Sequence, residues 1–163
     1  MTNQWLILKF GGTSVSGKQQ WATIESLARQ RLGQGYRVVL VCSAMAGITN
    51  ALQRLTVVEN VHKKDEVGKI LYRYRKLATD LGIESEDLLD EAAQQITDNL
   101  KTITGAVNDS DRYAGIASLL SIGEWLSTRI GNRYLEKKLE IESQDARQAL
   151  QTKKKKKKKT KNE

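Results

Sequence analysis

The stretch that decides the fold is WLILKFGGTSV, residues 5–15. The apolar run at its start, Trp5–Leu8, predicts a buried strand over Trp5–Phe10, which the following glycines end. Lys9, Gly11 and Gly12 then bring a cation and bare backbone N–H groups to the point where the strand ends. Cations and free N–H groups are what a phosphate needs around it, so this stretch favours an anion site.

The next segment predicts a helix and a second strand. Ser16 is a suitable N-cap for a helix over Gly17–Leu32, which has an apolar face and ends before two glycines. The second strand, Arg37–Ser43, is continuously apolar from Val38 to Cys42. Strand, helix and strand at this spacing indicate a βαβ unit, and fully apolar strands indicate a parallel sheet buried on both faces. The fold class is therefore α/β.

Two loops follow the predicted strands, a first loop over Gly11–Ser16 and a second loop over Ala44–Thr49. The right-handed crossover rule brings both strand ends to one edge of the sheet, so the loops face one another. Open α/β sheets bind their ligands at that edge.

The remaining chain is predicted to be mostly helical. His62–Leu81 and Ser85–Ile103 form a helical hairpin joined at Gly82. Asp109, Ser110 and Asp111 offer caps for a helix over Arg112–Ser121, and Gly123 with Glu124 leads into a further helix that ends near Lys138. Glu140–Ser143 is predicted as a third strand, and Gln144–Thr152 as a turn or a short helix.

The first loop has two interpretations. It matches neither the Walker A pattern nor the dinucleotide fingerprint. A glycine pair often marks an ordinary turn, and a lysine at a strand end is often surface charge. Together with the hydroxyls of Thr13 and Ser14, the same residues form a compact set of donors for phosphate.

Two further stretches carry polar groups in apolar surroundings. In the second loop, Thr49 either caps the following helix or, with Ser43, binds a small substrate through hydroxyl groups. Glu124 stands among apolar neighbours in LSIGEWLS, residues 120–127. It is either a half-exposed helix residue or the acceptor for a substrate ammonium group, because burying a carboxylate requires a cation.

Composition excludes several classes of protein. The chain has 163 residues with 39% hydrophobic residues, which suits one globular domain, and no apolar run is long enough to span a bilayer. One cysteine, Cys42, and one histidine, His62, are too few for zinc and disfavour thiol catalysis. We expect Cys42 to be a buried, inert thiol in a cytoplasmic protein.

Lysines between Lys153 and Lys161 supply most of the net charge of +8, and we expect this tail to be disordered, without a specific nucleic-acid site.

Four motifs in this order resemble the aspartate kinases: KFGGTSV, SAMAGITN, the SIGEWLS segment and Asp145-Ala146-Arg147. The form fused to diaminopimelate decarboxylase is also similar. The resemblance implies an amino-acid-kinase fold and phosphorylation of the L-aspartate side chain with ATP and Mg²⁺. It further implies that Lys9 stabilises the transferring phosphoryl group. The ATP phosphates would be bound by four consecutive residues, Lys9, Phe10, Gly11 and Gly12. By the same resemblance, Ser43 and Thr49 contact aspartate, and Glu124 binds its amino group.

The resemblance also sets expectations about extent and partners. Residues 1–152 match only the N-terminal part of the catalytic domain, and 153–163 form the lysine-rich tail, so we expect a truncated chain without kinase activity of its own. Strands at the cut edge are expected to expose apolar surface. A homo-oligomer, or association with a full-length kinase, is one expected partnership. Polyanion binding through the tail, and another kinase of the same fold acting on glutamate or uridylate, are the alternatives.

Overall fold

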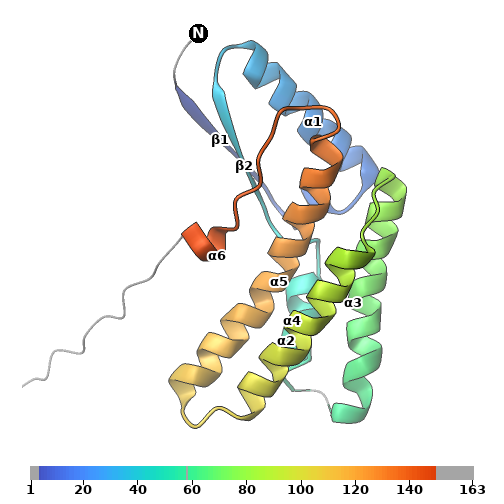
Figure 1. Cartoon of the computed structure of the whole chain (residues 1–163), viewed down its shortest axis with the longest axis vertical. Helices are drawn as coiled ribbons and strands as arrows, with labels where there is room; N and C mark the ends of the chain where they lie inside the picture. The colour runs from blue at the N-terminus through green and yellow to red at the C-terminus, as the bar shows by residue number, and fades with distance from the viewer. Residues whose placement is uncertain (1–3, 58, 150–163) are drawn as a thin grey trace, which may run out of the picture.

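The computed structural model describes residues 4–57 and 59–149, and its first elements follow the predicted order (Figure 1). The strands β1 (Trp5–Phe10) and β2 (Arg37–Cys42) pair in parallel, and α1 (Lys18–Gly33) connects them. The register runs from Trp5 opposite Arg37 to Phe10 opposite Cys42. The predicted βαβ unit is therefore confirmed. The predicted tail, 153–163, lies outside the described residues, as do residues 150–152.

The start of α1 differs from the prediction. Its N-cap is Gly17, and no side chain caps the helix. Ser16 instead donates its hydroxyl to the carbonyl of Gly12 at 2.5 Å and accepts the N–H of Ala46 at 3.0 Å. A short 3-10 helix, η1 (Gly12–Val15), lies directly before Ser16. The Ser16 hydroxyl is thus used between the two loops, which leaves it no part in capping.

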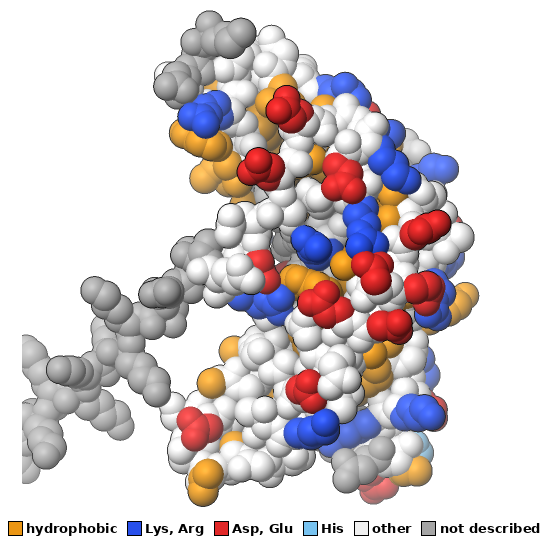
Figure 2. Space-filling view, viewed as in Figure 1, with side chains coloured by type: hydrophobic (Ala, Val, Ile, Leu, Met, Phe, Trp, Pro, Cys, Tyr) orange, Lys and Arg blue, Asp and Glu red, His pale blue; other side chains and the backbone are white. Residues whose placement is uncertain are grey.

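The described sheet is covered on one face only, so the prediction of burial on both faces is wrong for these residues. Phe10, Leu40 and Cys42 are half-buried and pack against the core. On the other face, Trp5 and Ile7 are 60% and 67% exposed. Hydrophobic side chains accordingly gather at the surface where β1 and β2 lie (Figure 2). The described sheet has two strands, and each contains a run of at least four apolar residues.

Among the described residues, five helices follow the sheet. They are α2 (Ile48–Arg54), α3 (Asn60–Leu81), α4 (Glu86–Thr104), α5 (Asp109–Leu135) and α6 (Ala146–Ala149). The predicted hairpin of α3 and α4 is confirmed, and Gly82 between them has the left-handed backbone that ends a helix (φ 68°). The short α6 lies within the segment predicted as a turn or short helix.

Two predictions about the second half of the chain are wrong. The two helices expected before and after Gly123 are one continuous helix, α5, whose N-cap is Asn108, with its side chain accepting the N–H of Asp111. Glu140–Ser143 forms no strand. Ile141 of this segment and the preceding Leu139 pack against the core instead of joining the sheet.

The core forms around α5, which lies against α4 along its length (Figure 1). Three buried glycines on α5 allow close contacts: the position of a Cβ at Gly115 lies 2.9 Å from Ile103, at Gly123 2.9 Å from Ala44, and at Gly131 1.9 Å from Trp21. Helix α5 thus contacts α4, the second loop and α1 through glycines. Within the described residues, no helix combines the length and apolar character needed to cross a bilayer.

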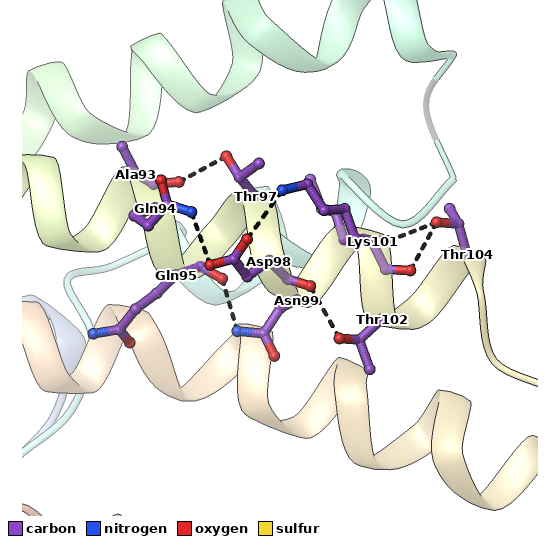
Figure 3. A network of polar contacts seen from close by, with 10 residues as sticks. Ala93, Gln94, Gln95, Thr97, Asp98, Asn99, Lys101, Thr102 and Thr104 are labelled. Atoms are coloured by element: carbon purple, nitrogen blue, oxygen red, sulfur yellow. Dashed lines mark hydrogen bonds and ion pairs between the residues drawn. The ribbon is translucent and has the colours of Figure 1, made fainter.

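The outer face of α4 is polar, and the hydrogen bonds drawn in Figure 3 join residues of this helix to one another. Thr97 and Thr102 donate to backbone carbonyls four residues earlier, and Asp98 accepts from Gln94 and Lys101. Acidic and basic side chains intermingle over this side of the molecule (Figure 2). These contacts stabilise a solvated helix surface, and we place no site there.

Candidate active site

The first and second loops meet at the carboxyl edge of the sheet, as their topology predicted. The N–H of Ser43 donates to the carbonyl of Phe10 at 3.0 Å, which continues the ladder past β2. Ala46 N–H then reaches the carbonyl of Gly12 at 3.2 Å. A Cβ at Gly12 would lie 2.8 Å from the Ala44 carbonyl oxygen, so only glycine permits this approach. The loops therefore form one backbone unit.

The first loop leaves donors available at its outer side. Lys9 is exposed, on the open face of the sheet, and forms no ion pair within the described part of the chain. The position of a Cβ at Gly11 meets no atom within 4 Å, so the backbone there is open to a ligand. Phe10 directs its side chain to the core and uses its carbonyl for Ser43.

Trp21 holds the far end of the first loop. Its buried indole N–H donates to the carbonyl of Val15 at 3.0 Å, and its ring fills the space left by Gly131 on α5. The first loop is therefore fixed at both ends, by the sheet at Phe10 and by α1 at Val15.

The second loop turns at Gly47, which has φ 78° and is the N-cap of α2. The capping alternative for Thr49 is wrong, because no side chain caps this helix and Thr49 lies in its first turn with an exposed side chain. Its hydroxyl remains available to a ligand. Ser43 is half-buried directly before the loop.

Glu124 lies beside the second loop. The preceding residue, Gly123, packs so closely on the loop that a Cβ would lie 2.9 Å from Ala44 and 3.0 Å from Ile48. Glu124 itself is exposed, and no ion pair joins it to another described residue. The structure thus brings the second loop and Glu124 together, whereas Lys9 belongs to the sheet face that the helices leave open.

Comparison with known proteins agrees with this arrangement. A sequence profile described as the Amino acid kinase family matches residues 4–163. The chain belongs to the amino acid kinase family. It is 29% identical over 150 residues to the aspartokinase of Chlamydia muridarum (strain MoPn / Nigg). This alignment covers 90% of this chain and 31% of that protein. The structure also resembles E. coli aspartokinase III in complex with aspartate and ADP (R-state), with a TM-score of 0.56 and 24% identity over 82% of this chain and 29% of that one.

These matches set the extent of the resemblance. The chain spans less than a third of the length of either aspartokinase. The fold of this member of the amino acid kinase family is accordingly a partial one, with a small parallel sheet and mostly helical content. The expected amino-acid-kinase fold is confirmed, and the matches to two aspartokinases agree with the resemblance that the motifs carry.

The cysteine and the histidine considered in the sequence lie at the end of β2 and on α3. Burial raises the pKa of the Cys42 thiol to about 11, so the thiol stays protonated at neutral pH. His62 is exposed on α3. Among the described residues, no three His, Cys, Asp or Glu side chains gather closely enough to hold a metal ion.

Three contacts that hold the site together were not predicted from the sequence. The Ser16 hydroxyl accepts from Ala46, the Arg73 guanidinium donates to the Ala46 carbonyl at 2.7 Å, and the Tyr74 hydroxyl donates to the Gly123 carbonyl at 2.7 Å. Each partner lies far along the chain, so no local spacing signals these contacts.

Proposed function

We propose that this chain forms the phosphate-facing and aspartate-binding part of an aspartate kinase, which transfers a phosphoryl group from ATP to the side-chain carboxylate of L-aspartate and forms 4-phospho-L-aspartate. One observation carries the proposal: the first loop, the second loop and the Gly123–Glu124 turn of α5 pack directly on one another. The similarity to two aspartokinases supports the choice of substrate.

The nucleotide would lie against the first loop. Lys9 offers an exposed ammonium group that forms no ion pair with another described residue, and the backbone at Gly11 is open where a side chain would otherwise stand. Such backbone suits close approach of phosphate oxygens. Gly12 and Phe10 would serve by holding the loop in place, through the contact with Ala44 and the bond to Ser43. Mg²⁺ would be held chiefly through the ATP phosphates and water, as is usual for this ion.

Aspartate would lie between the second loop and α5. The hydroxyls of Ser43 and Thr49 would donate to its carboxylates, and the exposed carboxylate of Glu124 would accept its ammonium group. The reacting carboxylate is ionised at neutral pH, so the transfer needs no general base. What the chain must supply is placement and neutralisation of charge, which are the main requirements of phosphoryl transfer.

We also propose a cytoplasmic location, which the lone Cys42 supports.

A binding experiment tests the aspartate side of this proposal. The full chain, labelled with ¹⁵N, is titrated with L-aspartate and separately with succinate, which lacks the ammonium group. We expect amide shifts at Ser43, Thr49 and Glu124, and affinity for L-aspartate about tenfold above that for succinate, the effect of one charge-assisted hydrogen bond. Glu124→Gln should abolish this preference, whereas Glu136→Gln, a change of an exposed glutamate just beyond α5, should retain it.

Two results would contradict the proposal. One is an absence of L-aspartate shifts around the second loop; the other is a preference for L-aspartate that survives Glu124→Gln. A parallel incubation with ATP, Mg²⁺ and hydroxylamine traps any aspartyl phosphate as its hydroxamate. Product formed by this chain would overturn the expectation that it does not turn over alone, while supporting the substrate assignment.

A further inference from the structure

Two adjacent residues of α3, Arg73 and Tyr74, form hydrogen bonds to the second loop and to α5, which make up the proposed aspartate site. Tyr74 is fully buried, and its hydroxyl donates to the carbonyl of Gly123 at 2.7 Å, next to Glu124. A second hydrogen bond of 3.2 Å joins the Tyr74 hydroxyl to the Ser127 hydroxyl. Burial raises the pKa of Tyr74 to about 12, so the phenol remains a donor at neutral pH.

Arg73 reaches the second loop from the preceding position. Its Nη2 donates to the carbonyl of Ala46 at 2.7 Å, and its side chain is half-buried. The N–H of the same Ala46 faces the first loop, at 3.0 Å from the Ser16 hydroxyl and 3.2 Å from the Gly12 carbonyl. Ala46 is thus held on both sides, by the first loop through its N–H and by α3 through its carbonyl.

We propose that Arg73 and Tyr74 are positioning residues that set the separation between the second loop and Glu124, and so the fit of an amino-acid substrate; this inference rests on the function proposed above. Neither residue needs to touch the ligand. Because the two contacts come from consecutive residues of one helix, any shift of the loop relative to α5 must break at least one of them. A site ordered before binding avoids the entropic cost of ordering it around the ligand.

The same helix provides matched controls. Tyr72 and Arg75 flank the pair and repeat its residue types, but both are exposed, and Arg75 bonds Glu86 on α4 at 2.8 Å instead of the loop. Tyr74→Phe and Arg73→Met remove the polar contacts while keeping most of the packing volume. Tyr72→Phe and Arg75→Met make the same chemical changes away from the site.

The measurement is the ratio of L-aspartate to succinate affinity for each variant of the full chain. A loss of global stability lowers both affinities equally and leaves the ratio unchanged, whereas a displaced Glu124 lowers only the affinity for L-aspartate. We expect Arg73→Met and Tyr74→Phe each to reduce the ratio about fivefold, within the range for one lost hydrogen bond to a charged or buried group. Arg73→Lys should restore part of it, and the two controls should match the unmodified chain.

A ratio that Arg73→Met and Tyr74→Phe leave unchanged would overturn the inference. If the unmodified chain shows no L-aspartate binding, the proposed function fails. The positioning role of Arg73 is then tested without a ligand, through the mobility of the second loop. Amide hydrogen exchange at Ala46 is then compared in the ligand-free chain. Faster exchange in Arg73→Met than in Arg75→Met supports the positioning role, and equal exchange refutes it.

Discussion

Replacing Gly131 with alanine would place a methyl group inside the indole ring of Trp21. The added Cβ would lie 1.9 Å from Cη2, 2.3 Å from Cζ3 and 2.5 Å from Cζ2 of that ring. Trp21 is 1% exposed and its N–H donates to the Val15 carbonyl, so the ring cannot move without disturbing the core and the end of the first loop. The substitution therefore tests the contact between α1 and α5.

The expected loss combines three effects. Overpacking a tight site costs about 1–3 kcal/mol, and a displaced Trp21 gives up a hydrogen bond worth about 1 kcal/mol. Alanine in a helix interior returns about 1 kcal/mol relative to glycine, which offsets the lost hydrogen bond. We expect Gly131→Ala to lower the free energy of unfolding by about 2 kcal/mol or more, or the Tm by about 6 °C for a chain of this size.

Urea unfolding followed by circular dichroism at 222 nm measures this change. The matched control is Gly68→Ala on α3, where an added Cβ meets nothing within 4 Å; this variant should gain up to about 1 kcal/mol. Trp21→Phe removes the ring atoms that the new methyl group would meet, so the double variant should be more stable than the sum of the single changes predicts. The packing argument is refuted if Gly131→Ala is as stable as the unmodified chain.

Three further changes have clear expected results. Gly12→Ala puts a Cβ 2.8 Å from the Ala44 carbonyl oxygen, a backbone atom that cannot swing away, and should weaken L-aspartate binding about tenfold or more in the same titration; unchanged binding would show that the loops can separate without effect. The Arg133 guanidinium lowers the pKa of Asp87 from 3.8 to about 2, so the pair stabilises the fold above pH 4, and this contribution is lost as the pH falls towards 2. Asp87→Asn should therefore lower the unfolding free energy at pH 7 by less than about 1 kcal/mol and have a smaller effect near pH 2, and a loss that does not vary with pH would contradict this pairing. Ile7→Thr with Val41→Thr should reduce self-association of the chain in sedimentation velocity, because both side chains are exposed on the open sheet face; equal association by the unmodified chain would show that this face is not responsible.

The sequence predicted the βαβ unit and the meeting of the two loops because local signals sufficed. Each strand contains a short apolar run with a glycine near one of its ends, and the parallel pairing determines which strand ends meet. Helix α5 was predicted as two pieces because Gly123 has a low intrinsic helix propensity. In the structure, packing of Gly123 on Ala44 and Ile48 outweighs that preference, so a residue expected to break the helix instead makes a close contact.

Predictions that depended on distant partners failed or were not made. Ser16 was predicted as a cap, but it bonds Ala46, which lies 30 positions away. The contacts of Arg73 and Tyr74 join residues 27 and 49 positions apart. The candidate site residues themselves were found through the family resemblance, and their roles stay predictions; what the sequence lacked was any sign of how α3 supports them.

The glycines of α5 stand at regular intervals of eight residues, at Gly115, Gly123 and Gly131. Eight residues advance an α-helix by about 12 Å and turn it by about 80° beyond two full turns. The three contacts with α4, the second loop and α1 therefore follow a shallow screw around one axis. Adding or deleting a single residue between them would turn the rest of the helix by about 100°, and one neighbour would meet a side chain where it now meets a glycine. The screw consequently fixes the length of α5 over this span, and with it the direction in which Glu124 projects.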